Sequence, residues 1–526
     1  MKTIRIIAFL FLMLSATPSF SQENGFFKRF PSEGKWLVPS CAIETDDGNF
    51  IVAINDDSFE GNGELAKLSS EGELLLTNPF NDPDHWSRAY NVFRHPQEQG
   101  TFIGLGTDIE PPFEFNHIYN GIPYFFHFDE ELNLTFQTYP EWPEELRNYW
   151  LSPTSLLGKD RKVFCEYFLM NYEGGLNFRR IRTKMSLNGD FERFIEDTTD
   201  MTSNGLKAIF EFPGTKDIGI YRESQLLGDS FNSSYNTLFR VNQGLECEPI
   251  NKLYRFGEDT IITSTYIDFR AIFLMATNSY STIIPLDDST LLFSTDADES
   301  LYRYAVDTNM FDLQHSAVMF KADTAGNIGQ HCVIGSWNDT IEFIPNRSID
   351  VTDPSNTGNR KIYHCCYSQN KTSYESPNTL TVTKFTEEFD ILWRKRYSLY
   401  NTCLKACHLM ATSDGGCLIV GTVTVDENHE WFALKLLPDG TVGTGEITVT
   451  DEIFFYPNPA RDVLHLHYPQ EMQPTQIELY DLQGRLVRTK TTGFESLSME
   501  GLSAGQYVLK VTLENGKVYT DKVVKE

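Results

Sequence analysis

Residues 408–423 read HLMATSDGGCLIVGTV, and residues 433–445 read ALKLLPDGTVGTG. In each segment, two apolar runs flank a short turn rich in Asp and Gly, which is the pattern of a β-hairpin. The turn at Asp414-Gly415-Gly416 supplies both a side-chain acceptor and the positive φ angle that a sharp reversal requires. Taken together, the two segments predict one sheet of four strands.

The second hairpin recurs along the chain as an apolar strand that ends in a basic residue, followed by a polar turn and another strand. Segments like residues 408–423 precede most copies, for example at residues 41–54 and 281–295. The intervals between successive basic positions are 60, 57, 56, 81, 63 and 51 residues. The basic positions are Lys67, His127, Lys184, Arg240, Lys321, Lys384 and Lys435. Four-stranded units at this spacing are typical of β-propellers.

Seven copies predict an all-β fold, a seven-bladed β-propeller over residues 22–446. One four-stranded sheet cannot bury both of its faces, whereas sheets stacked in a closed ring bury them against one another. The segment from Phe26 to Phe30 resembles the segment from Leu392 to Tyr397, which should be an outer strand. We therefore expect the N-terminal strand to complete the last blade. The interval of 81 residues requires an insertion, which we expect at residues 253–278.

The last segment, residues 453–526, has the pattern of a separate small β-domain, and residues 447–452 are expected to be a linker. Apolar and polar residues alternate from Val463 to His467 and from Tyr507 to Leu513. Turn residues such as Asn515-Gly516 separate these runs, and Asn-Gly favours a two-residue hairpin turn. Several short strands at this spacing predict a β-sandwich.

Four motifs occur in order along this terminal module. They are Tyr456-Pro457-Asn458-Pro459, the run from Leu479 to Arg485, Leu502 with Gly505-Gln506-Tyr507, and Lys522-Val523-Val524-Lys525. Together they resemble the type A C-terminal sorting domain of the type IX secretion system. The resemblance implies an Ig-like sandwich that engages the secretion machinery and directs the protein across a bacterial outer membrane. It also implies that the module is later removed, and that the protein is released or tethered to surface lipopolysaccharide.

The resemblance singles out a set of residues as the sorting motif. They are Pro457, Asn458, Pro459, Gly484, Gly505, Lys522 and Lys525. An ordinary Ig-like adhesion module is the alternative interpretation. His465 and His467 are expected on the same strand face, where they could form a metal pair or simply be exposed histidines.

The start of the chain has the pattern of a secretory signal peptide, residues 1–21. Lys2 and Arg5 precede an apolar core, and the small residues Ser19 and Ser21 follow it. No later run approaches the about 20 apolar residues of a membrane helix, so we expect no transmembrane segment. The chain has 44 basic and 73 acidic residues, a net charge of −29, which disfavours nucleic acid as a partner. We expect export through the periplasm to the medium or the outer-membrane surface.

No recognisable catalytic motif stands out in the sequence, and we expect no metal and no cofactor. Cys403, Cys407 and His408 could bind zinc, but they lack the paired Cys-x-x-Cys spacing that marks such sites. Disulfides or buried thiols are the alternative for the nine cysteines. Trp142 and Trp150 could form a platform for carbohydrate, or they could pack between blades.

Two functions remain open from the sequence. The first is a non-catalytic binding or scaffold module for an extracellular ligand, a glycan or a protein. The second is a hydrolase or lyase that acts on polysaccharide or peptide at the mouth of the propeller channel. Converging carboxylates, or a histidine with two charged partners, would favour the enzyme. Ordinary polar and apolar side chains at the axis would favour binding.

Overall fold

The computed structural model contains β-strands and a single short 3-10 helix, η1 (Glu144–Leu146), within the described residues. The structure describes residues 25–525 except 33, 57–61, 81–85, 111–119, 148, 172–176, 198–204, 227–232, 253–281, 299–314, 335–339, 346, 354–357, 371–378, 401, 426–427, 444–445, 452, 459 and 470–471. The predicted signal peptide and the predicted insertion at residues 253–278 lie outside this set. Across the described part of the chain, no helix has the length and apolar character to cross a bilayer.

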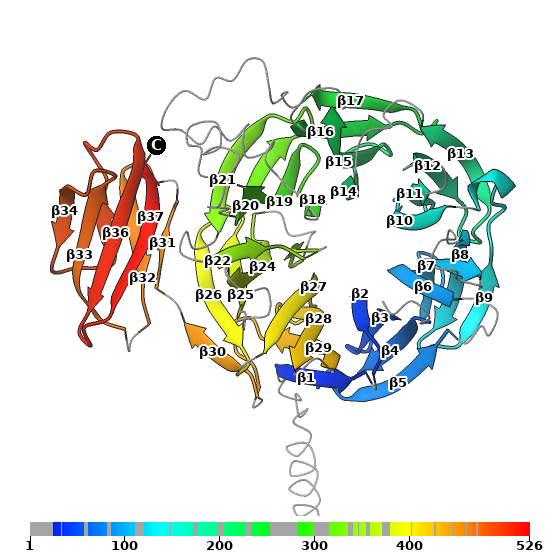
Figure 1. The fold of residues 1–526 in the computed structure, drawn as a ribbon, viewed down its shortest axis with the longest axis horizontal. Coiled ribbons are helices and arrows are strands. Elements are labelled where there is room, and N and C mark those ends of the chain that lie inside the picture. Colours follow the sequence, from blue (N-terminus) through cyan, green and yellow to red (C-terminus); the bar gives the residue numbers. More distant parts are fainter. Residues whose placement is uncertain are drawn as a thin grey trace, which may run out of the picture.

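The large domain is a β-propeller in which antiparallel sheets stand around a central axis (Figure 1). Most of the sheets consist of four consecutive strands, the first innermost and the last outermost. The first two sheets contain β2 (Leu37–Glu44), β3 (Phe50–Asp56), β4 (Glu64–Leu68) and β5 (Leu74–Pro79), and β6 (Trp86–Arg94), β7 (Thr101–Glu110), β8 (Asn120–Asp129) and β9 (Leu134–Thr138).

The next three sheets repeat this arrangement. They contain β10 (Trp150–Leu157), β11 (Val163–Asn171), β12 (Asn177–Met185) and β13 (Phe191–Asp197); β14 (Gly205–Glu211), β15 (Ile218–Leu226), β16 (Ser233–Val241) and β17 (Cys247–Lys252); and β18 (Thr282–Pro285), β19 (Thr290–Asp298), β20 (His315–Asp323) and β21 (Ile328–Ile334).

The sheet that follows is larger because it gains a strand from the segment expected to be a linker. It contains β22 (Thr340–Phe343), β23 (Ile349–Val351), β24 (Lys361–Asn370), β25 (Thr379–Thr386) and β26 (Ile391–Ser398). Strand β30 (Thr448–Asp451) pairs antiparallel with the outer edge of β26, with Lys395 opposite Asp451. Residues 447–452 therefore include a strand that extends a propeller sheet.

Both ends of the propeller sequence meet in one sheet, as the sequence predicts. Strands β27 (Cys403–Ala411), β28 (Cys417–Val425) and β29 (Asn428–Leu436) are completed by β1 (Phe26–Pro31), which pairs antiparallel with β29. Phe30 stacks on Trp431 with ring centroids 4.0 Å apart. The expectation that the N-terminal strand completes this blade is confirmed.

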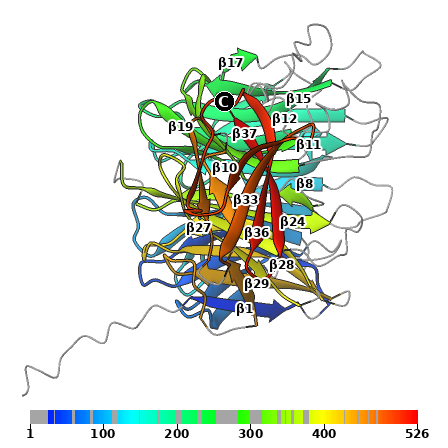
Figure 2. The same cartoon turned by 90° about the vertical axis from the view of Figure 1, so that its left-hand side faces the viewer.

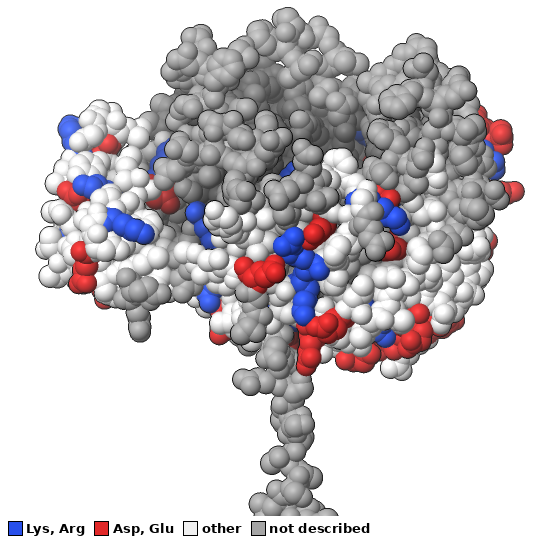
Figure 3. Space-filling model, turned by 60° about the horizontal axis from the view of Figure 1, so that its bottom comes forward, with Lys and Arg blue, Asp and Glu red and all other residues white. Residues whose placement is uncertain are grey.

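Burial follows the position of each strand in its sheet. Strand β3 reads FIVAIND, and all of its residues are buried because neighbouring sheets cover both of its faces. The outer strand β5 reads LLLTNP, and its first four residues are exposed. Figure 3 turns this lower side of the ring toward the viewer. The apolar material of each sheet is thus concentrated where sheets face each other.

The repeated basic residues lie on the third strand of successive sheets, and most of them reach the next sheet. Lys67 Nζ donates to the carbonyl of Glu130 at 3.0 Å. A ring nitrogen of His127 lies 2.7 Å from the carbonyl of Leu187. Lys184, Lys321 and Lys384 also contact the following sheet, whereas Arg240 and Lys435 contact acidic side chains of their own sheets. Five of the seven basic residues therefore join neighbouring blades, namely Lys67, His127, Lys184, Lys321 and Lys384.

The turn after each third strand contains one residue with positive φ, and the space beside several of these residues is filled. At Gly72, a Cβ atom would lie 2.5 Å from the ring of Phe26 in the adjoining blade. At the equivalent Leu132 (φ 60°) and Leu245 (φ 67°), the residue's own side chain is buried. The left-handed region disfavours leucine, so burial of the side chain offsets a backbone cost.

The terminal module consists of two sheets beside the ring (Figures 1 and 2). One contains β31 (Phe454–Tyr456), β32 (Val463–His467) and β35 (Ser496–Ser498); the other contains β33 (Pro474–Asp481), β34 (Leu486–Lys490), β36 (Gly505–Leu513) and β37 (Val518–Lys525). Inward residues of both sheets, such as Leu464, Leu479 and Leu509, form one core. The predicted alternation along Tyr507–Leu513 corresponds to buried positions in β36.

Candidate functional site

Asn458 connects the first predicted motif of the terminal module to its last strand. Its side-chain oxygen accepts a hydrogen bond from the N–H of Val524 at 2.9 Å, and its side-chain nitrogen donates to the carbonyl of Lys522 at 3.0 Å. The N–H of Ala460 donates to the carbonyl of Val524 at 2.8 Å. The first and last motifs, 64 residues apart at Asn458 and Lys522, therefore form one structural unit.

The other predicted motif residues are placed by backbone geometry. Gly484 has φ 76° in the turn between β33 and β34, and Gly505 has φ 147° at the start of β36. Both angles favour glycine over residues with a side chain. Lys525 is buried and forms a parallel bridge with Ala460. Pro459 lies outside the described residues. The role of Ala460 is not predictable from the sequence, because it depends on pairing with the distant strand β37.

Aromatic residues of β31 stack against two histidines of β32 whose side chains are otherwise exposed to solvent. His467 stacks on Phe454 with ring centroids 4.6 Å apart, and His465 stacks on Tyr456 at 5.4 Å. These four side chains lie on adjoining strands that pair through Phe454 with His467 and Tyr456 with His465. The stacking gives the two histidines a packing role beside the Pro457-Asn458 turn.

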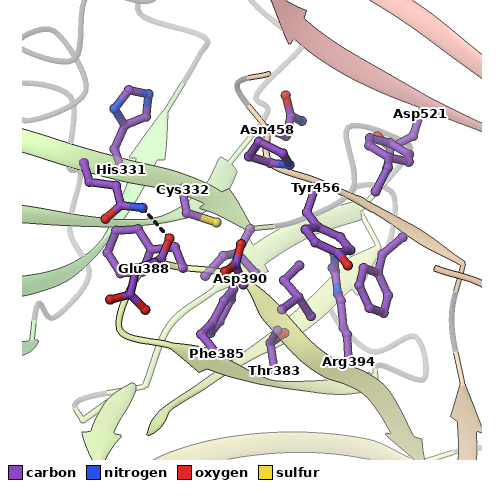
Figure 4. Close-up of a pocket in the computed structure, with 17 residues that line it drawn as sticks. His331, Cys332, Thr383, Phe385, Glu388, Asp390, Arg394, Tyr456, Asn458 and Asp521 are labelled. Atoms are coloured by element: carbon purple, nitrogen blue, oxygen red, sulfur yellow. Dashed lines mark hydrogen bonds between the residues drawn. The ribbon is translucent and has the colours of Figure 1, made fainter. Parts of the chain in front are cut away.

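A small pocket of about 60 Å³ lies between this turn and the propeller (Figure 4). The terminal module contributes Tyr456, Asn458 and Asp521, and the propeller contributes residues of β21, β25 and β26 together with the turn between the last two strands. Gln330 donates to the carbonyl of Glu388 at the propeller side of the pocket. A second cavity of about 400 Å³ lies beside the first, along the same boundary between the propeller and the terminal module. We call this boundary the seam.

The pocket has a mixed lining. Arg394 lines both cavities, and Asp390 and Asp521 line the smaller one, so charges of both signs face the seam. Burial raises the pKa of the Cys332 thiol to about 12, which keeps this thiol neutral in the pH range of cells. This seam is not predictable from the sequence, because its lining comes from four separate segments, at residues 330–334, 383–394, 454–458 and 521.

Near the propeller axis, the described polar side chains join neighbouring blades. Ser40 Oγ donates to the carbonyl of Ala89 at 2.7 Å, and Asn91 donates to Ser155 at 2.9 Å. Ser40 is the residue left unpaired by a β-bulge in the innermost strand β2. Bulges redirect side chains, and here the redirected hydroxyl reaches the next blade.

The candidate zinc ligands lie on one innermost strand, β27. Cys403 is buried, Cys407 lies at a β-bulge, and His408 is buried, which holds its pKa well below the usual value. In the part of the chain that the structure describes, no group of three His, Cys, Asp or Glu side chains is arranged to hold a metal ion. Trp142 is buried against Tyr167, so this tryptophan packs inside the protein.

Residues 454–526 match the family model described as the secretion system C-terminal sorting domain. The terminal module is a sorting domain of this family. The match covers both ends of the unit held by Asn458, and the sorting domain implies export across the outer membrane to a secreted or cell-surface location. It also implies an interaction with the secretion machinery. The sequence-based recognition of this domain is confirmed.

Solved structures similar to the chain include other propellers and enzymes. The β-propeller domain of the trilobed protease from Pyrococcus furiosus is 8% identical, with a TM-score of 0.36 over 76% of this chain and 96% of that chain. An ulvan lyase, a polysaccharide lyase, is 9% identical, with a TM-score of 0.42 over 78% and 94%. A puromycin hydrolase is 11% identical, with a TM-score of 0.41 over 90% and 58%. Similarities of this size carry no information on activity. Comparison with curated proteins returns no match.

Proposed function

We propose that this protein is an exported seven-bladed β-propeller that binds an extracellular ligand or acts as a scaffold and does not itself catalyse a reaction. The observation that carries this proposal is the use of polar groups at the axis. Ser40, Asn91 and Ser348 hydrogen-bond to side chains or backbone of an adjoining blade. Groups engaged in this way hold neighbouring blades together, which favours a structural role for them over a catalytic one.

The blade count in this proposal rests on the repeated basic residues. Each of the seven lies on the third strand of a different sheet, and the sheets follow one another around the ring. We assign residues 22–446 to the propeller, 447–452 to the connection and 453–526 to the sorting domain. We also infer that residues 1–21 are a signal peptide that brings the chain to the periplasm.

We infer that the sorting domain is Ig-like and that its motif residues act as one signal. Its two sheets pack through a shared core, and Tyr507 donates its hydroxyl to the carbonyl of Ser503 at 2.7 Å, a contact that resembles the tyrosine corner of Ig-like domains. Because Asn458 holds Lys522 and Val524, the two ends of the motif can be presented together. Pro457, Pro459, Gly484, Gly505 and Lys525 complete the proposed signal.

Binding and catalysis are separated by one experiment on the mature protein. The protein is applied to glycan arrays and immobilised extracellular proteins, and in parallel the same protein is incubated with polysaccharides and peptides. The proposal expects saturable binding and no new products by mass spectrometry. Product that accumulates in proportion to protein concentration would establish the hydrolase or lyase alternative instead.

A further inference from the structure

The outer strand of the first blade is an open sheet edge. Strand β5 is the last strand in the order β2-β3-β4-β5, and within the described residues it pairs with β4 alone. Strand β9 holds the same position in the neighbouring blade. An open edge presents unpaired backbone N–H and C=O groups that can accept a further strand.

This edge is unusually apolar. The exposed fractions of Leu74, Leu75 and Leu76 are 45%, 47% and 38%, and Leu134 and Phe136 of β9 are exposed at 37% and 38%. Neither β5 (LLLTNP) nor β9 (LTFQT) contains a charged residue. Two adjoining blades thus present large apolar side chains on their outer strands.

Other outer strands of the same ring carry charged residues. Charges on an edge strand discourage pairing with other chains. The charged outer strands are β1 (FFKRFP), β13 (FERFIED), β17 (CEPINK) and β26 (ILWRKRYS). Strand β21 (IGQHCVI) also lacks a charged residue, but it lines the pocket beside the terminal module. The contrast therefore marks β5 and β9 as edges without this protection and away from the terminal module.

The chain itself shows what can cover a blade edge. Strand β30 extends the sheet at β26, where Lys395 lies opposite Asp451 and Arg396 opposite Thr450. A basic edge therefore receives a short extended strand that ends in an acidic residue. The pairing is of the kind in which backbone hydrogen bonds supply affinity and side chains supply specificity.

Acidic residues border the open edge at β5. Glu71 and Glu73 precede the strand and are exposed, and Glu131 precedes β9 and is also exposed. Glu73 pairs with Lys28 of β1, whereas Glu71 and Glu131 form no ion pair among the described residues. Figure 3 shows red acidic groups beside uncharged white surface on this side of the ring. The whole chain carries a net charge of −29, which disfavours a second copy as the partner. The charge pattern instead fits a partner that carries basic residues.

We propose that the outer edge of β5 accepts an extended segment of a partner protein, with apolar residues opposite the leucines and Lys or Arg at the end that lies beside the start of β5. This inference rests on the proposed binding role and specifies its surface and its partner. Backbone pairing with β5 gives the segment its extended form. Its basic end lies near Glu71 and Glu73, which both precede the strand.

Synthetic peptides test this proposal with the mature full-length protein. The probe is acetyl-KKTVTVTVKK-amide, and the charge control is acetyl-EETVTVTVEE-amide, both measured by calorimetry. The proposal expects saturable binding of the basic peptide that weakens about tenfold with Leu75→Lys, since one unfavourable contact can cost about 1.4 kcal/mol. Leu392→Lys is the matched control, because Leu392 is 43% exposed on the outer strand β26, which carries basic residues and pairs with β30 from Lys395 to Ser398.

The other possible results would contradict the proposal. Equal binding of both peptides, or an equal loss with Leu75→Lys and Leu392→Lys, would overturn the proposal. A dimer of the wild-type protein that Leu75→Lys converts to a monomer would assign the edge to a second copy and also overturn it. A protein that binds glycans or other ligands but neither peptide would keep the general binding role while ending this specific inference.

Discussion

The side-chain oxygen of Asn458 accepts the N–H of Val524 at 2.9 Å, and this bond fastens the entry of the sorting domain to its final strand. The same side chain donates to Lys522, so a single residue serves two backbone groups of β37. Truncation of the carboxamide leaves both groups without this partner. The two ends of the motif should then separate from each other more easily than the two sheets of the domain core do.

The first prediction concerns Asn458→Ala. We expect the free energy of unfolding of the sorting domain to fall by about 2 kcal/mol, since each lost hydrogen bond contributes about 1 kcal/mol. We also expect less protein to reach the cell surface or medium in a host with the secretion machinery. Thr492→Ala removes an exposed hydroxyl of the same domain outside the four motifs and serves as control. Unchanged export of Asn458→Ala would contradict the role given to this residue.

The second prediction concerns ring closure through Phe30. Phe30→Ala removes the ring that stacks on Trp431 and should destabilise the propeller by about 3 kcal/mol, the usual cost of such a truncation in a core. Urea unfolding followed by tryptophan fluorescence measures the change. Phe136→Ala removes an exposed ring from the outer strand β9 and should have little effect. Similar losses for the two variants would refute a special role for Phe30.

The third prediction concerns the cations between blades. Lys384 Nζ donates to the carbonyls of Pro438 and Gly415 and lies 4.8 Å from the ring centre of Tyr363. Lys384→Met should lower stability by about 2 kcal/mol because two carbonyls lose a charged donor. Lys405→Met changes an exposed lysine of β27 and is the matched control. Equal thermal midpoints for Lys384→Met and the wild type would argue against the contact.

The fourth prediction concerns pH. Burial, and then the charge of Arg394, lowers the pKa of His364 to about 3, so the folded protein keeps this histidine neutral in mild acid. The unfolded chain binds a proton there below about pH 6.5. Stability should therefore fall as pH decreases from 6.5 toward 3, by up to about 1.4 kcal/mol per pH unit from this group.

Denaturant unfolding at pH 7 and pH 5 measures this dependence. His364→Leu removes the titrating group, so the stability of this variant should change less between the two pH values. His465→Leu replaces an exposed histidine of the sorting domain and should leave the dependence of the propeller unchanged. The same pH dependence in His364→Leu and the wild type would show that another group is responsible.

The repeat along the chain predicts a propeller because its signal is local and occurs many times. A basic residue after an apolar strand and before a turn marks the third strand at Lys67, Lys184 and Lys384. The resemblance of the segment at Phe26 to that at Leu392 also predicts correctly that the N-terminal strand is an outer one. Such features depend on alternation and turn chemistry, which neighbouring residues determine.

The features that the sequence does not predict depend on distant pairings. Strand β30 has four residues, too few for a clear alternating pattern, and it forms only because the edge of β26 is available. The motif at Asn458 is recognisable, but its hydrogen bonds to β37 are visible only in the fold. The seam at Cys332 and Arg394 likewise requires three dimensions.

The pairing of β1 with β29 also sets the order of events when the chain is made. Phe26 to Pro31 leaves the ribosome early, yet its partner, Asn428 to Leu436, is among the last propeller segments to be synthesised. Until then, Phe26 and Phe27 have no partner strand, and the nascent propeller is an incomplete arc with an unpaired sheet edge. A chaperone that binds unfolded chains can act throughout the time before β29 is synthesised. The ring can close only when synthesis of the propeller is nearly complete.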